Sequence, residues 1–187
     1  MDRRQRKTRA AIFNAFTALL NRKSYYKITV QEIIDAADVG RSTFYDHFET
    51  KDALLEMLCR ELFDHIARAL LDKSHSHCQF TLDGQSTSAF CHILYHLQDD
   101  ERYILRLLAR ERNETFIECF KQNMNGLLRD EKFFNPKWRT LGVPEDFLID
   151  HITSSFVNMI QWWFRNKMRP EPPTMDEYFR SMMSAVI

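Results

Sequence analysis

Glycine and proline are scarce in this chain, with 4 and 5 among 187 residues. An all-β sandwich needs many tight turns, in which these two residues predominate, so their scarcity argues against that fold. No run approaches the roughly 18 apolar residues of a membrane-spanning helix. No apolar stretch with a small-residue cleavage site follows the basic N-terminus, so no signal peptide is expected.

Cysteine is also sparse, at positions 59, 78, 91 and 119, and no two cysteines have the CxxC spacing. In a chain of this size without an export signal, we interpret them as free thiols of a reducing compartment. The expected localisation is cytoplasmic.

Net charge is absent overall, since 26 basic residues balance 26 acidic ones, but the distribution is uneven. The first 27 residues hold eight bases against the single acid Asp2, which leaves 18 bases and 25 acids in the rest. A basic end on an otherwise acidic chain indicates an anionic partner at that end, either nucleic acid or a membrane surface. We expect no membrane partner, because the apolar stripe of the helix that follows the basic residues is needed to pack against the next helices.

Helical periodicity of apolar residues runs through nearly all of the chain, which predicts an all-α fold. Polar or proline-containing stretches at 73–88, 133–143 and 169–173 are expected to be loops. We predict a first domain over 1–50, a connecting helix over 51–72, and a second domain over 73–187. The expected helices are 3–21, 30–37, 41–48, 51–72, 89–109, 113–129, 144–167 and 174–185.

Two short helices joined by a tight turn lie between Thr29 and Phe48. Thr29 and Glu32 have capping-box spacing, and Asp38-Val39-Gly40 is a turn whose glycine is free to adopt positive φ. This is the pattern of a helix-turn-helix with a second helix of the size that enters the major groove. The residues expected in its core are Ile33, Ile34, Ala37, Val39, Phe44 and Phe48.

The other face of the second short helix is polar and suited to nucleic acid. Arginine donates to guanine, and serine and threonine donate or accept at base edges, whereas tyrosine and histidine can hold phosphates. Lys51 lies in the first turn of the next helix, where a cation opposes the helix dipole, which makes sense if a phosphate docks there. The residues expected on this surface are Arg41, Ser42, Thr43, Tyr45 and His47. Asp46 is interpreted as an intramolecular partner.

The run from Ile28 to Leu55, with the core Ser-Thr-Phe-Tyr-x-His-Phe-x-x-Lys, resembles the DNA-binding signature of the tetracycline-repressor (TetR/AcrR) family. The resemblance covers about residues 5–62. It implies an all-α homodimer with an N-terminal three-helix DNA-binding domain and a divergent C-terminal ligand-binding and dimerisation domain. It also implies DNA contacts from Thr29, Arg41, Ser42, Thr43, Tyr45, His47 and Lys51. Thr29 could equally be a cap alone.

The C-terminal half, with its Gln-Trp-Trp-Phe run and closing helix, is similar to a C-terminal type found in bacterial members, including one linked to control of a dihydroxyacetone-kinase operon. We expect the last two long helices to form a four-helix bundle with a partner chain, through Phe156, Ile160, Trp163, Phe179 and Met183. An apolar pocket with a few polar anchors would hold a small-molecule effector. Candidate anchors are Tyr103, Arg106, Arg110, Asn158 and Gln161, although the two arginines could as easily pair with surface acids.

Two histidine clusters raise the question of a metal: His75, His77 and Cys78, and Cys91, His92 and His96. His92 and His96 are four residues apart and would share a helix face, a spacing that can chelate zinc or copper. A structural site needs four ligands in closed geometry, so loop and surface histidines are the simpler interpretation. We expect no metal and no cofactor.

No GxSxG, P-loop or GxGxxG motif is present, so an enzyme is not expected. We interpret the chain as a sequence-specific DNA-binding regulator, a repressor released by an unidentified small molecule. Its homodimer would bind a palindromic operator, with the N-terminal arm of Arg3, Arg4, Arg6 and Lys7 adding phosphate or minor-groove contacts. The alternative is a co-regulator, or a protein- or ligand-binding module of the same fold, that acts through a partner protein.

Overall fold

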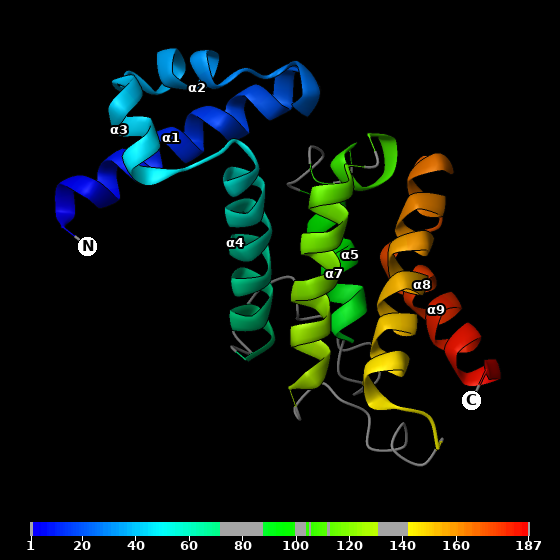
Figure 1. Cartoon of the computed structure of the whole chain (residues 1–187). Coiled ribbons are helices and arrows are strands. Elements are labelled where there is room, and N and C mark those ends of the chain that lie inside the picture. Colours follow the sequence, from blue (N-terminus) through cyan, green and yellow to red (C-terminus); the bar gives the residue numbers. More distant parts are fainter. Residues whose placement is uncertain are drawn as a thin grey trace. The chain divides into compact units, whose positions relative to one another are not determined.

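The computed structural model describes residues 2–71, 88–99, 104, 106–111, 113–130 and 142–186. Within these ranges every regular element is helical and no strand occurs, which confirms the predicted all-α fold. The chain divides into two compact units, Met1–Leu58 and Cys59–Ile187. The division falls inside the long helix α4 (Asp52–Leu71), which therefore runs without interruption from one unit into the other (Figure 1).

The first unit is a small helical cluster around one apolar core. Helix α1 crosses beside α2, and α3 follows α2 after a short turn (Figure 1). Ile12, Phe16, Ile33 and Phe44 are fully buried at the centre of this cluster. The elements are α1 (Arg3–Arg22), η1 (Tyr25–Lys27), α2 (Val30–Ala37), α3 (Arg41–His47) and the first turns of α4.

The second unit is a bundle in which α8 contacts α7, η3 and α9, and α5 contacts α9 (Figure 1). Its interior includes three mutually packed rings, those of Phe90, Phe156 and Phe179, whose centroids lie 4.7–5.3 Å apart. The elements are α5 (Ala89–Asp99), the π-helical turn η3 (Arg106–Arg110), α7 (Glu114–Arg129), α8 (Glu145–Arg165) and α9 (Pro172–Val186).

Several expected boundaries are corrected by the structure. The segment 89–109 was expected to be one helix, but α5 ends at Asp99 and residues 106–110 form a π-helical turn. Pro144 is the N-cap of α8 rather than a residue of its first turn, and α9 begins at Pro172 rather than Thr174. Proline is tolerated in a first helical turn because its missing N–H would have no partner there, so the Pro-rich stretch starts the helix.

The expected loops at 73–88 and 133–143 fall mostly outside the described residues. Among the helices that are described, none is both long enough and apolar enough to cross a membrane.

Candidate nucleic-acid interface

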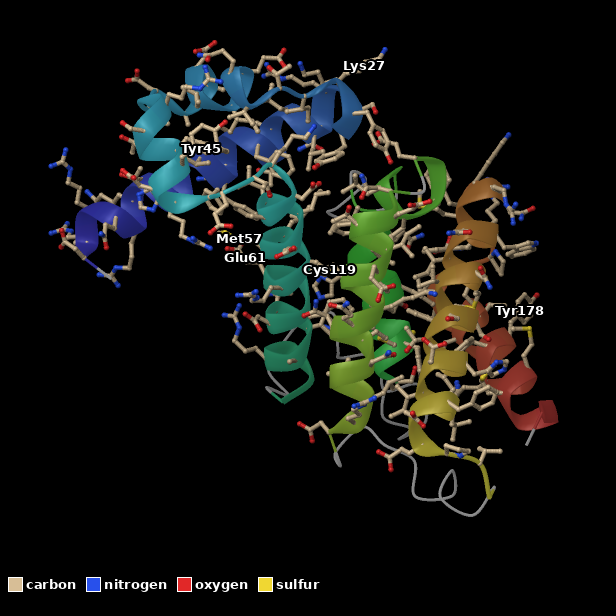
Figure 2. All side chains as sticks on the ribbon, viewed as in Figure 1. Lys27, Tyr45, Met57, Glu61, Cys119 and Tyr178 are labelled. Carbon is tan, nitrogen blue, oxygen red and sulfur yellow. The ribbon has the colours of Figure 1, made fainter. Side chains whose placement is uncertain are left out.

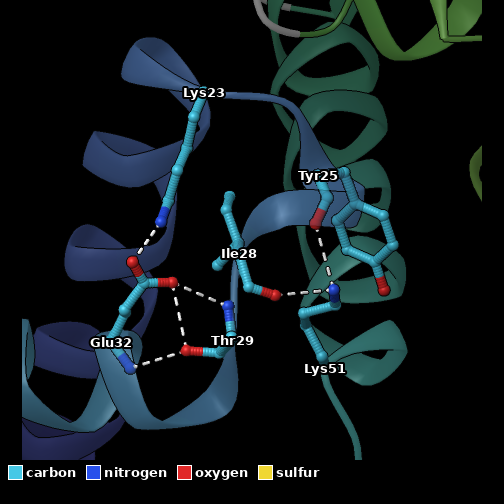
Figure 3. Close-up of polar contacts among 6 residues, drawn as sticks. All are labelled: Lys23, Tyr25, Ile28, Thr29, Glu32 and Lys51. Atoms are coloured by element: carbon cyan, nitrogen blue, oxygen red, sulfur yellow. Dashed lines mark hydrogen bonds and ion pairs between the residues drawn. The ribbon is translucent and has the colours of Figure 1, made fainter.

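The helix-turn-helix begins at the capping box predicted from the sequence. The Thr29 hydroxyl accepts a hydrogen bond from the Glu32 N–H at 3.2 Å, and the Glu32 carboxylate accepts one from the Thr29 N–H at 2.9 Å (Figure 3). The ammonium of Lys23 pairs with the same carboxylate. The hydrogen bond from Lys23, followed by those from Thr29, lowers the pKa of Glu32 to about 2. Glu32 therefore joins the end of α1 to the start of α2.

The turn between α2 and α3 has the predicted position but a different backbone from the predicted one. Asp38 takes the left-handed conformation, with φ 52°, whereas Gly40 has φ −73° and is the N-cap of α3. Aspartate tolerates this region better than most residues because its short polar side chain can hydrogen-bond locally. The expectation that glycine supplies the positive φ was wrong.

Helix α3 separates its apolar and polar side chains onto two faces. Phe44 and the C-cap residue Phe48 are 0% and 2% exposed, which confirms their predicted place in the core. The polar face carries Arg41 and Ser42, both exposed, and Tyr45, which is 46% exposed. Figure 2 labels Tyr45 on this helix. Thr43 and His47 are half-buried at the edges of this face, and Asp46 is exposed beside them. The polar face presents hydrogen-bond donors and acceptors on a helix of seven residues.

The basic N-terminal arm is helical from its third residue. Arg3, Arg4, Arg6 and Lys7 are exposed on the first two turns of α1, and Asp2 forms a capping box with Gln5. These four cations therefore lie along a helix instead of an extended arm.

Arg9 is a residue whose role the sequence reasoning missed. Its guanidinium donates to the carbonyl oxygen of His47 at 3.2 Å and lies 4.5 Å from the centroid of the Phe48 ring. Both contacts join α1 to the end of α3, so Arg9 orients the helix that carries the polar face. The signal was its spacing, because Arg9 shares a helical stripe with the buried Ile12 and Phe16.

Lys51 also contributes to the architecture of this unit. Its ammonium donates to the carbonyl oxygens of Ile28 at 2.8 Å and Tyr25 at 3.0 Å (Figure 3). It also lies 4.0 Å from the centroid of the Tyr25 ring, and burial lowers its pKa. The Tyr25 hydroxyl in turn donates to Asp52, and burial, followed by this bond, raises the tyrosine pKa. Two of the three ammonium donors thus hold the start of α4 against η1.

Of the five residues predicted as effector-pocket anchors, Asn158 and Gln161 are the two whose side chains are described. Tyr103 is outside the described ranges. Arg106 and Arg110 are the first and last residues of η3, and their side chains are not described. The Gln161 amide donates to the carbonyl oxygen of Leu108 at 3.1 Å. It therefore fastens the π-helical turn to α8. Asn158 is exposed on α8.

Asn158 instead lines an open groove of about 650 Å³ between α8 and α9. Large apolar side chains dominate the groove: Trp162 is 43% exposed, Tyr178 51% and Met182 49%. Figure 2 labels Tyr178 on α9. A contiguous exposed apolar surface of this kind is typical of a binding face. The other lining residues are Ser155, Met159, Met175 and Ser181.

Four of the five residues predicted for the dimer interface lie in the interior of the single chain. Phe156, Ile160 and Trp163 are 0% exposed and Phe179 is 1% exposed, whereas Met183 is half-buried. The Trp163 indole donates to the carbonyl oxygen of Pro170 at 2.6 Å. These side chains stabilise the interior of the bundle. A contact between two chains through α8 and α9 would therefore have to use exposed residues of these helices.

Only part of the histidine and cysteine clusters can be placed. His75, His77 and Cys78 lie outside the described residues. The Nε2 atoms of His92 and His96 are 3.1 Å apart on α5, and Cys91 is buried, which raises its pKa to about 12. In the part of the chain that the structure describes, no group of three or more histidine, cysteine or acidic side chains is arranged to hold a metal ion.

The fold and the two-faced α3 define the first unit as a helix-turn-helix of the kind found in DNA-binding regulators. Residues 12–58 match the family model described as bacterial regulatory proteins, tetR family, and residues 84–185 match that of a transcriptional regulator C-terminal region. The chain belongs to the tetR family of bacterial regulatory proteins. Because members of this family are transcriptional regulators, the prediction of a regulator rather than an enzyme is confirmed.

Solved structures agree with this assignment. A TetR transcriptional regulator from Streptococcus agalactiae 2603V is 32% identical, with a TM-score of 0.70 over 97% of this chain and 96% of that one. NalD, the secondary repressor of the MexAB-OprM efflux pump in Pseudomonas aeruginosa, shares the fold at 20% identity, with a TM-score of 0.60 over 98% of this chain and 97% of that one.

A curated relative, the HTH-type transcriptional regulator YxbF of Bacillus subtilis strain 168, is 38% identical over 74 residues. That match covers 37% of this chain but only 20% of the length of YxbF.

Proposed function

We propose that the chain is a homodimeric repressor that binds a palindromic operator through α3 and is released from it by a small-molecule effector. One observation carries the proposal: α3 buries Phe44 completely while it exposes Arg41, Ser42 and Tyr45. A short helix fixed on one side and polar on the other is what base-edge recognition in a major groove requires.

The roles of individual residues follow from their exposure. Arg41, Ser42 and Thr43 are proposed to contact base edges, and Tyr45, His47 and Thr29 to contact phosphates. Two of the three donors of the Lys51 ammonium hold carbonyl oxygens, so a phosphate contact would use the third. The helical cations Arg3, Arg4, Arg6 and Lys7 add sequence-independent attraction, which makes binding strongly dependent on salt.

The groove between α8 and α9 is the proposed dimer interface. A partner copy would cover the apolar surface of Trp162, Tyr178 and Met182 by placing its own α8 and α9 against them in a four-helix bundle. An isologous contact of this kind is self-complementary, as two-fold symmetry requires. The two copies of α3 would then read half-sites about 34 Å apart, one turn of the duplex.

The effector is proposed to bind in the second unit, near the π-helical turn that Gln161 fastens to α8. π-helical turns occur often at functional sites. Tyr103, Arg106 and Arg110 remain the proposed anchors. The resemblance to a dihydroxyacetone-kinase operon regulator and a cytoplasmic location are part of the same proposal, the first supported by the Gln-Trp-Trp-Phe run at 161–164.

The test is selection of genomic fragments by the purified protein at about 50 mM and about 200 mM salt, followed by sequencing of the DNA retained at the higher concentration. Enrichment of a short palindrome would support the proposal. Salt-sensitive retention without an enriched sequence would overturn operator recognition by the protein alone. Absence of retention at both concentrations would favour the alternative of a co-regulator that acts through a partner protein.

A further inference from the structure

Two thiols from helices far apart in sequence meet in the second unit. Cys59 lies in α4 and is fully buried, whereas Cys119 lies in α7 and is half-buried (Figure 2). Their thiols hydrogen-bond to each other, and the Asn123 side-chain amide lies 3.7 Å from the Cys59 sulfur and 3.5 Å from the Cys119 sulfur. The amide is held in place because it also donates to the Cys119 carbonyl oxygen at 2.8 Å.

The two thiols differ in exposure. The hydrogen bond to Cys119 and burial raise the pKa of Cys59, so Cys59 keeps its proton. Cys119 is half-buried, so it is the sulfur that an oxidant from solvent meets first. A thiolate on Cys119, the nucleophilic form, would accept hydrogen bonds from both the Cys59 S–H and the Asn123 amide.

The helices around the pair are already packed together. The Phe63 ring, one turn along α4 from Cys59, meets the Phe120 ring of α7 edge to face, with centroids 5.0 Å apart. A disulfide needs a sulfur–sulfur bond of about 2.05 Å, so its formation brings the two sulfurs closer together than thiol contact does. Cys91 is also buried, but it lies on a different helix, α5.

We propose that Cys59 and Cys119 form an oxidation site for hydroperoxides, at which a reversible disulfide ties α4 to α7. The Cys119 thiolate attacks the peroxide, its sulfur takes up an oxygen as sulfenic acid, and the peroxide leaves as water or an alcohol. The Cys59 thiol then displaces that oxygen as a second water. In sum, two thiols and one hydrogen peroxide give one disulfide and two waters.

The consequence for regulation, which rests on the proposed function, follows from α4. This helix continues without a break into the unit that carries α2 and α3. A disulfide that displaces α4 would bias the helix-turn-helix away from its operator-binding position, and cytosolic thiols would reverse the effect by reducing the disulfide.

The test uses the whole protein with stoichiometric hydrogen peroxide, thiol counting after denaturation, and peptide mass mapping. We expect loss of two thiols and a peptide that links residues 59 and 119 in the wild type. The linked peptide should persist in Cys91→Ala and be absent in Cys119→Ser, with thermal melts to verify that both variants fold. A Cys119 oxidised to sulfinic acid while Cys59 stays a thiol, or thiols that do not react, would overturn the proposal.

Two further measurements test separately the role of Asn123 in the oxidation site and the effect of the disulfide on DNA binding. Asn123→Ala should slow the reaction at least about threefold, because the thiolate loses a hydrogen-bond donor; an unchanged rate would remove Asn123 from the site.

Oxidised wild type should bind the selected operator at least about tenfold more weakly than reduced protein, whereas Cys119→Ser should not respond. Unchanged operator affinity in cross-linked protein would overturn the regulatory role. Failure of the reduced protein to bind DNA would count against the proposed function and not against the disulfide. Peptide mapping tests the thiol chemistry independently of DNA binding.

Discussion

The two units of the molecule can be compared through one pair of adjacent aromatic residues in each. In α3, Phe44 is 0% exposed and Tyr45 is 46% exposed; in α8, Trp162 is 43% exposed and Trp163 is 0% exposed. Each pair places one ring in the core and the next at the surface. The predicted burial of Phe44 and surface position of Tyr45 are confirmed, whereas Trp163, which was predicted at the dimer interface, is buried in the structure.

The difference lies in what fixes the phase of each helix. In the helix-turn-helix, three local signals fix which side of α3 faces the core. They are the capping box at Thr29 at the start of α2, the turn that follows α2, and the spacing of Phe44 and Phe48. In α8, apolar residues occupy both the core face and the groove face, so periodicity alone identifies a helix without identifying its inner side. The lesson is that a surface inferred from hydrophobicity needs a packed structure to orient it when a helix carries apolar residues on more than one face.

The largest expected effect is on the core member of the α3 pair. Phe44→Ala should lower the free energy of unfolding of the first unit by about 3–5 kcal/mol, because it leaves a cavity at a fully buried site. Tyr45→Ala on the same helix should change it by less than about 0.5 kcal/mol. Chemical denaturation monitored by circular dichroism measures both, and equal losses would show that the two-faced description of α3 is wrong.

The next effect concerns the α8 pair. Trp162→Glu should weaken dimerisation by about 100-fold or more, because an interface would have to bury an unpaired carboxylate. Phe147→Glu is the matched control, since Phe147 is an exposed aromatic on α8, 64% exposed, that does not line the groove. Sedimentation velocity over a concentration series compares the two. An intact Trp162→Glu dimer would place the interface elsewhere.

The Lys51 contacts predict a loss of stability together with a loss of affinity. Lys51→Ala should lower the free energy of unfolding by about 1–3 kcal/mol, because two carbonyl oxygens lose their donor. It should also weaken binding to operator and random DNA about equally. Lys27→Ala, which removes the same charge from an exposed position, controls for electrostatics. A melting temperature equal to that of the wild type would contradict the role of Lys51 in the fold.

The polar face of α3 predicts a selective effect. Arg41→Ala and Thr43→Ala should each cost about 1–3 kcal/mol on the selected operator and much less on random DNA, because base contacts alone distinguish the two. Fluorescence anisotropy with both DNAs gives the ratio. Equal losses on both would assign these residues to phosphates instead of bases.

The smallest effect is the pH dependence that Glu32 brings to the first unit. Its pKa is lowered from about 4.5 to about 2 in the folded protein, so its contribution to stability is present above pH 4.5 and is lost as the pH falls toward 2. Glu32→Gln should therefore reduce the loss of stability on acidification across this range. A variant and a wild type with parallel stability curves would show that the Lys23 and Thr29 contacts have no energetic effect.

Much of the first unit follows from sequence because its signals are local. Capping spacing predicted the start of α2, and Phe44 and Phe48 were assigned to the core from spacing alone. Arg9 and Lys51 were different, since the contacts of Arg9 with His47 and of Lys51 with Tyr25 join residues 26 or more positions apart. The Cys59–Cys119 contact between α4 and α7 is likewise a product of tertiary packing, which no spacing rule contains.

The central claim is that the polar face of α3 reads bases in both halves of a palindrome. The most direct measurement is to select DNA from a randomised library with the wild type and with Arg41→Ala, and to compare base preferences position by position. The account predicts that preference relaxes at one position in each half-site, symmetrically, and is retained elsewhere. A uniform fall in preference at every position, or loss in one half only, would contradict it.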